Sequence, residues 1–351
     1  MVGWTRRQRV GPIGVDIGSR SVKLVQFSAD RSHIREAVRW DLPSATCADT
    51  VERSRQLVDA LVQAREGRAF RGRDAVLCLS TSDLFVQNIR VPQTTGDQLQ
   101  QVVEKEAANR LPFDAAQAEL RFFEADTVRQ GDAFRREVIV LACQRPSLQL
   151  LLTIADAAHL NAVAIDAAPA AMLRCYAAQF RRSSDEDMCA MFMSVGASCT
   201  TVVIARAEQP RFIKQVDFSS RQLDEAVAHD LRMKLADAAI LRRNNGDRRA
   251  DRRDPEIAES IAKATRPVLE AMANELAMCM RYYSVTFRGQ PLARVVIGGG
   301  EASPGLAEWL SARLDMTCEL ANPLRPFDQV PLPGRAAQWD VAIGLALRET
   351  T

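Results

Sequence analysis

The sequence predicts a mixed α/β protein of two related domains, each of which opens with two strands joined by a glycine turn. The first such stretch, residues 13–24, reads IGVDIGSRSVKL, and the second, residues 191–204, reads MFMSVGASCTTVVI. Both alternate apolar with small or polar residues around a glycine, as expected of strand, tight turn and strand. One copy in each half of a 351-residue chain indicates two similar domains that face each other.

The first turn carries residue types that suit a phosphate site. Gly18 can adopt backbone angles closed to other residues and lets a ligand come close. Ser19 and Ser21 offer hydroxyl and backbone N–H donors to phosphate oxygens. Asp16 ends the first strand, where it can hold a water on Mg²⁺, an ion that takes only one or two carboxylates. Taken alone, the turn fits an ordinary hairpin equally well.

The second turn repeats the first with a change of charge. Gly196 and Cys199 take the places of the first-turn glycine and its second serine, and Ser194 takes the place of Asp16. A third glycine stretch, residues 294–306, reads RVVIGGGEASPGL. It predicts a strand that ends in three glycines, followed by a helix with Ser303 as its cap. Bare glycine backbone there lets a flat ligand lie against the chain.

Hydrophobic periodicity predicts the remaining elements in order. In the first half we expect strands at residues 34–40, 75–79, 84–91, 120–127, 134–143 and 162–165, and helices at 50–66, 95–110, 146–159 and 168–180. Thr95 is the expected cap of the second of these helices. In the second half we expect a strand at 211–218, a short strand at 316–320, and helices at 220–234, 236–243, 255–287 and 339–347. The polar segment 181–187 reads as a linker and the charged segment 244–254 as a loop.

Composition restricts the kinds of binding partner and the cellular compartment that we expect for this protein. With 46 basic and 44 acidic residues, the net charge of +2 gives no reason to expect nucleic acid or an acidic membrane as the main partner. The eight cysteines are scattered, without a C-x-x-C pair, which fits a reducing cytosol. Residues 1–9 are basic but lack a following apolar core, so they do not read as a signal peptide. The uncharged run 188–205 has polar residues at its centre, so we expect two buried strands rather than a membrane span.

The three glycine stretches, in this order, resemble the superfamily of actin, Hsp70, sugar kinases and the FtsA-like division proteins. Two further stretches narrow the likeness: residues 91–113, which begin VP and end NRLPF, and residues 218–225, FSSRQLDE. They look like segments of the PilM family of actin-like type IV pilus assembly proteins. The resemblance covers nearly the whole chain.

The resemblance implies an actin-like ATPase fold, in which two related mixed-sheet domains flank a nucleotide cleft. Domain I would cover residues 1–182, with a small α+β subdomain inserted at about 92–144. Domain II would cover residues 188–351, and its last helix would pack back at the hinge. ATP or ADP, with Mg²⁺, would lie between the domains.

The resemblance also implies roles for individual residues. The phosphates would be held by two groups, Asp16, Gly18, Ser19, Ser21 and Lys23 from the first turn, and Ser194, Gly196, Ala197, Cys199 and Thr200 from the second. The adenosine would be held by Gly298, Gly299, Gly300, Ser303, Arg242 and Arg243. Asp16 would hold Mg²⁺ through water. Lys23 could equally face solvent, and Ala239 stands where relatives carry an acidic ribose contact. Asp166 is a second, weaker catalytic candidate after Asp16, and it could equally cap the next helix.

Three functions follow from this resemblance, and we favour the first. It is an ATP-binding cytoplasmic scaffold at the inner membrane that docks the N-terminal tail of a PilN-like membrane protein. Residues around 92–125 would line that groove. The family's second turn normally begins with Asp, so the uncharged Ser194 predicts weak or absent ATP hydrolysis. The alternatives are a small-molecule kinase with Asp166 as its base and a filament-forming actin homologue. The sequence leaves self-association and the identity of the pilus system open.

Overall fold

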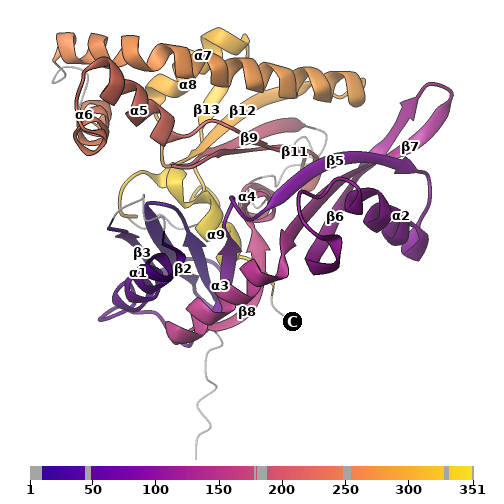
Figure 1. The fold of residues 1–351 in the computed structure, drawn as a ribbon, viewed down its shortest axis with the longest axis horizontal. Helices are drawn as coiled ribbons and strands as arrows, with labels where there is room; N and C mark the ends of the chain where they lie inside the picture. Colours follow the sequence, from indigo (N-terminus) through magenta and orange to yellow (C-terminus); the bar gives the residue numbers. More distant parts are fainter. Residues whose placement is uncertain are drawn as a thin grey trace, which may run out of the picture.

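The computed structural model describes residues 10–43, 49–177, 179, 188–247, 254–327 and 332–349, and in these ranges it contains three sheets (Figure 1). The first sheet holds, in spatial order, β3 (Ile34–Asp41), β2 (Ser21–Phe27), β1 (Ile13–Ile17), β4 (Asp74–Leu79) and β8 (Asn161–Ala167). The second holds β11 (Gln209–Val216), β10 (Thr200–Arg206), β9 (Cys189–Val195), β12 (Leu292–Gly299) and β13 (Cys318–Leu320).

The two sheets share one topology. In each, the first three strands pair antiparallel, and two later strands join parallel on the other side. The predicted pair of related α/β domains is therefore present as a structural repeat. Helices α1 (Thr50–Gln63) and α3 (Arg145–Ala157) cover the first sheet through Leu57, Leu61 and Leu151. The second sheet is covered by α5 (Ser220–Asp230), α7 (Pro255–Thr286) and α8 (Pro304–Leu314), and α7 crosses the top of Figure 1.

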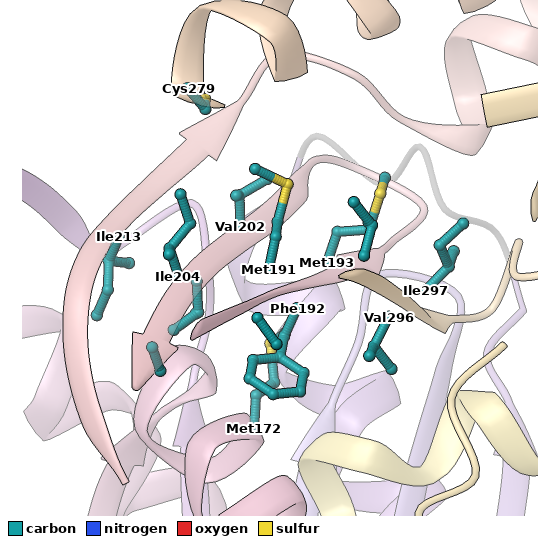
Figure 2. Close-up of a cluster of buried hydrophobic side chains, with 14 of the residues drawn as sticks. Met172, Met191, Phe192, Met193, Val202, Ile204, Ile213, Cys279, Val296 and Ile297 are labelled. Atoms are coloured by element: carbon teal, nitrogen blue, oxygen red, sulfur yellow. The ribbon is translucent and has the colours of Figure 1, made fainter. Parts of the chain in front are cut away.

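Both faces of the second sheet are buried. Figure 2 shows Met191 and Met193 of β9 pointing toward α7, where Cys279 lies, and Phe192 pointing the opposite way, toward Met172. This alternation is the two-residue period of a strand. Met172 belongs to α4 (Ala168–Ala177), which follows the first sheet in sequence but packs beneath the second. A strand buried on both faces explains the uncharged run in the sequence.

The third sheet forms the inserted part of the first half. It holds β5 (Phe85–Pro92), β7 (Ala133–Gln144) and β6 (Ala118–Gln130), and α2 (Gly96–Ala108) packs on it. The short 3₁₀ helix η1 (Ala115–Gln117) precedes β6. The sheet thus begins at Phe85, earlier than residue 92, because β5 pairs with β7 along its whole length. Alternation along a strand cannot reveal which sheet that strand will join.

Other boundaries also differ from expectation. Thr95 occupies the cap position of α2, but its side chain makes no cap hydrogen bond. Helix α6 (Leu235–Asp247) continues into the segment expected to be a loop at 244–254, of which residues 248–253 lie outside the described ranges. The predicted linker at 181–187 also lies outside them. Ser219 caps α5, together with Gln222 in a capping box.

The last helix, α9 (Asp340–Ala346), follows η4 (Ala336–Trp339) and packs between β1 and α4. Glycine permits both contacts. A Cβ at Gly344 would lie 1.8 Å from the carbonyl oxygen of Ala171 in α4, and a Cβ at Gly14 would lie 2.4 Å from that of Ala342. Within the described ranges, no helix has the length and apolarity needed to cross a membrane.

Candidate functional site

A cavity of about 690 Å³ opens between the two repeated turns. That volume lies within the roughly 300–1,000 Å³ of typical ligand pockets. Twelve of the predicted site residues line it: Asp16, Gly18, Ser19, Ser21, Lys23, Ser194, Gly196, Ala197, Cys199, Arg243, Gly299 and Gly300. Segments separated by up to 284 positions of sequence, from Asp16 to Gly300, therefore meet at one place.

The two turns are built alike. The Gly18 amide donates to the Ser21 carbonyl oxygen at 3.0 Å, and the Gly196 amide donates to that of Cys199 at 3.0 Å. A Cβ at either glycine would lie 2.9 or 2.7 Å from the same oxygen, so a larger residue would open the turn. The glycines let each turn stay tight at the cavity wall.

Charge distinguishes the two turns. Asp16 and Lys23 lie opposite each other in the β1–β2 register, and their Oδ2 and Nζ atoms are 2.6 Å apart. Both side chains are largely buried, so in this structure Lys23 does not face solvent. Ser194 and Thr201 occupy the corresponding register positions of β9 and β10. The second turn therefore lacks both the carboxylate and the cation of the first.

Three residues that were expected to contact the nucleotide make other contacts in this structure. The Thr200 hydroxyl donates to the Phe218 carbonyl oxygen at 2.9 Å, which braces the second turn from behind. The Ser303 hydroxyl accepts from a backbone amide and caps α8. Gly298 does not line the cavity, because its Cα faces the carboxylate of Asp340.

Arg242 also has another role. Its guanidinium makes a bidentate pair with Glu301 at 2.7 and 3.1 Å and bonds Asp224 at 2.7 Å. Burial by itself would lower the pKa of Arg242, but hydrogen bonding to and the charge of Glu301 raise that pKa well above its usual value. Arg242 is thus held in an ion-pair network, and Arg243 is the member of the pair that lines the cavity. Burial lowers the pKa of Arg243.

Asp166 lies away from the cleft. Its carboxylate pairs with Arg174 at 2.9 Å and with Arg348 at 2.8 Å, and it lines a different cavity. The sequence placed Asp166 correctly at the end of a strand, but β8 is the outermost strand of its sheet. Asp166, the weaker catalytic candidate, is therefore not among the residues that line the cleft.

An ion-pair network that the sequence did not reveal crosses the cleft. Arg20, in the first turn, donates to Ser220 Oγ at 2.9 Å and pairs with the fully buried Asp224, both on α5. Asp224 also receives Arg242 and, at 3.6 Å, Arg243. The contacts of Arg20 join residues about two hundred positions apart, so no local pattern could predict them.

Asp340 is a further cavity residue that the sequence analysis did not predict. It starts α9, lines the cavity and is fully buried, and its Oδ2 accepts from the Tyr176 hydroxyl at 3.2 Å. Burial raises the pKa of Asp340 to about 6. Its helix reads in sequence as a small-residue packing helix, which gives no signal for a ligand-facing carboxylate.

The lining chemistry suits a magnesium nucleotide. Arg20, Lys23, Arg53 and Arg243 supply cations for a polyanion, and the two turns bring backbone amides to the cavity wall. Among the described residues there is no group of three or more His, Cys, Asp or Glu side chains placed to hold a bare metal. Mg²⁺ needs no such group, because it keeps several waters and takes one or two carboxylates plus phosphate oxygens.

A second cavity, of about 1,260 Å³, lies where the inserted sheet meets the first sheet. Its lining includes Phe122 and Phe123 of β6, Val163 of β8, and Arg348 after α9. Of the range 92–125 expected to line a groove, only residues 119 and 121–123 do so. Within the described sheets, β6 and β8 are both outermost strands, so each has a backbone edge that pairs with no strand.

Comparison with known proteins agrees with the fold and the glycine turns. Residues 14–350 match the family model described as type IV pilus assembly protein PilM. The chain belongs to the PilM family. The recognition made from residues 91–113 and the glycine stretches is therefore confirmed.

Solved structures place the PilM-family chain among actin-like ATPase folds. A PilM–PilN type IV pilus biogenesis complex matches with a TM-score of 0.79 and 23% identity, over 97% of this chain and 98% of that one. Ethanolamine utilization protein EutJ from Carboxydothermus hydrogenoformans matches with a TM-score of 0.58 and 13% identity, over 97% of this chain and 89% of that one. A Bacteroides thetaiotaomicron protein with an actin-like ATPase fold matches with a TM-score of 0.53 and 7% identity, over 99% of this chain and 100% of that one. At these identities the likeness concerns the fold, and the predicted actin-like fold class is confirmed.

Proposed function

We propose that this type IV pilus assembly protein is a nucleotide-regulated scaffold. It binds ATP or ADP with Mg²⁺ in the cleft, and it docks the cytoplasmic N-terminal tail of a PilN-like inner-membrane protein in the second cavity. It works at the cytoplasmic face of the inner membrane, to which that partner holds it.

The observation that carries the nucleotide proposal is the meeting of the two matched turns at one cavity. Each turn exposes backbone where Gly18 or Gly196 excludes a side chain, and Arg243 and Lys23 add positive charge. Asp16 is the carboxylate of the first turn, within reach of a hydrated Mg²⁺. The uncharged pair Ser194 and Thr201 supports slow or absent hydrolysis, because phosphoryl transfer depends on neutralising developing charge.

The docking proposal is supported by the shape and chemistry of the second cavity. Two unpaired strand edges meet aromatic side chains, an arrangement that accepts an extended peptide by adding a strand. The charged pair Asp166 and Arg348 lies at the same place and can contact polar groups of the tail. The matched solved structure is described as a complex of PilM with PilN.

A peptide titration tests the docking site. A labelled synthetic peptide of the PilN-like tail is titrated with wild type, with Val163→Arg, which fills the cavity, and with Ile240→Arg. Val163 and Ile240 are both exposed apolar residues, but Ile240 lies on α6 and lines neither cavity. We expect Val163→Arg to weaken binding at least about tenfold and Ile240→Arg to bind like wild type. Equal affinities for all three proteins would reject this cavity as the docking site.

Calorimetry tests the nucleotide proposal independently. Wild type should bind ATP or ADP, and Gly196→Val, which adds a side chain where 2.7 Å separates the Cβ from a carbonyl oxygen, should not. Absence of nucleotide binding in folded wild type would leave a docking scaffold with an unused cleft. We do not propose a small-molecule kinase, because Asp166, its expected base, lies outside the cleft.

A further inference from the structure

Acidic side chains are unevenly distributed around the cleft. Its acidic lining residues are Asp16, Asp83, Glu301 and Asp340. Asp16 pairs with Lys23 beside the first turn, and Glu301 pairs with Arg242. Asp340 is a carboxylate that lies beside the second turn, because it packs against Gly298, the register partner of Ser194.

The strand ends are shaped to admit this carboxylate. Ser194 of β9 and Gly298 of β12 lie side by side in the parallel register. A Cβ at Gly298 would lie 2.4 Å from Asp340 Oδ2 and 2.7 Å from the Tyr176 hydroxyl. Any side chain at position 298 would therefore push Asp340 away from Ser194. Glycine there serves the carboxylate and not the ligand directly.

Neighbouring groups orient Asp340. Its Oδ1 accepts from the Val341 amide at 2.9 Å, and its Oδ2 accepts from Tyr176 at 3.2 Å. The charges of Lys23 and Asp16 both act on it, which places it in the same electrostatic environment as the first turn. A fully buried carboxylate is costly unless it is hydrogen-bonded or paired with a cation.

We propose that Asp340 supplies, from the hinge helix α9, the carboxylate that the second phosphate turn lacks at Ser194. This inference rests on the proposed binding of a magnesium nucleotide. Asp340 is a positioning residue that would hold waters of the hydrated Mg²⁺, as Asp16 would from the first turn. Asp340 would thereby connect the bound Mg²⁺ to α9, the helix that packs on β1 and on α4.

The test moves the carboxylate back to the turn. Nucleotide affinity is measured by calorimetry with Mg²⁺ and with EDTA, and the ratio of the two affinities is compared for wild type, Asp340→Asn and the double variant Asp340→Asn/Ser194→Asp. Loss of a water-holding partner of a metal typically costs about 10- to 100-fold in metal affinity. We expect the ratio of the affinity with Mg²⁺ to the affinity with EDTA to fall about 10- to 100-fold in Asp340→Asn. In the double variant this ratio should return most of the way to the wild-type value.

Asp83→Asn is the matched control, since it removes another acidic group of the cleft without touching Ser194. Its ratio should equal that of wild type. A merely structural role of Asp340 would lower the melting temperature but leave the ratio unchanged, and that result would overturn the proposal. If Asp340→Asn does not fold, the double variant decides, because it must keep a Mg²⁺ dependence close to that of wild type.

The outcomes separate this inference from the function on which it rests. Wild type that binds nucleotide equally well with and without Mg²⁺ would overturn the role of Asp340 and leave nucleotide binding standing. Wild type that binds no nucleotide under either condition would overturn both.

Discussion

Removing Arg20 should weaken the contact between the two halves of the molecule. Arg20 belongs to the β1–β2 turn, and its two polar contacts, to Ser220 and Asp224, both reach α5 of the other half. The Arg20 side chain is 23% exposed and that of Asp224 is fully buried, so solvent screens this pair only partly. We therefore examine Arg20→Met, which keeps the aliphatic length and removes the charge.

The loss in free energy of unfolding depends on which partners Asp224 keeps after Arg20 is replaced. Asp224 keeps Arg242 at 2.7 Å and Arg243 at 3.6 Å, so the variant leaves no unpaired buried carboxylate. The loss is then that of hydrogen bonds to a charged group, about 1.5–3 kcal/mol in free energy of unfolding. Asp224→Ala should cost more than Arg20→Met, because Asp224 pairs with three arginines, Arg20, Arg242 and Arg243.

Urea denaturation followed by circular dichroism measures these free energies. The control is Arg221→Met, which breaks the exposed pair of Arg221 with Glu225 on the same helix, at 2.8 Å but with both side chains 48% exposed. An exposed helical pair of this spacing contributes only about 0.2–0.5 kcal/mol. Equal losses for Arg20→Met and Arg221→Met would refute the reasoning that burial makes the cross-cleft pair structural.

Two further predictions test the packing of α9 and a surface turn. Gly344→Ala should lower the free energy of unfolding by up to about 2 kcal/mol, since overpacking costs up to about 3 and helix propensity returns about 1. Gly305→Ala is the control, because an added Cβ there would meet no neighbouring atom within 4 Å, and it should not destabilise. An unaffected Gly344→Ala would contradict the packing of α9 on Ala171. Asp30 has its pKa lowered to about 2, chiefly by hydrogen bonding from the Ser28 hydroxyl, so its stabilising effect is present above its unfolded pKa of 3.8 and is lost as the pH falls toward 2. Ser28→Ala should move the NMR-titrated pKa of Asp30 upward, and an unchanged titration curve would exclude that hydrogen bond as the cause.

The fold was predictable because its signals are local. Alternation around Gly18 and Gly196 specifies a strand, a tight turn and a strand within a dozen residues, and the structure contains both. The cap at Ser303 and the long apolar face of α7 are equally local, because helix start signals and periodicity act over neighbouring turns. The structure differs from expectation where pairing partners are distant, as for β5, whose alternation is the same in either sheet.

For the site, the sequence by itself determined the two glycine turns, the glycine strand end and the absence of a carboxylate at Ser194, because each is a property of a short segment. The tertiary structure alone decided which charges face the cleft. In the folded chain Arg242 pairs with Glu301, and Asp166 lines the second cavity. Asp340, near the far end of the chain, lies beside Ser194. These outcomes depend on how α9 packs between the two halves, and a contact across some 146 residues, from Ser194 to Asp340, leaves no periodic signal in the sequence.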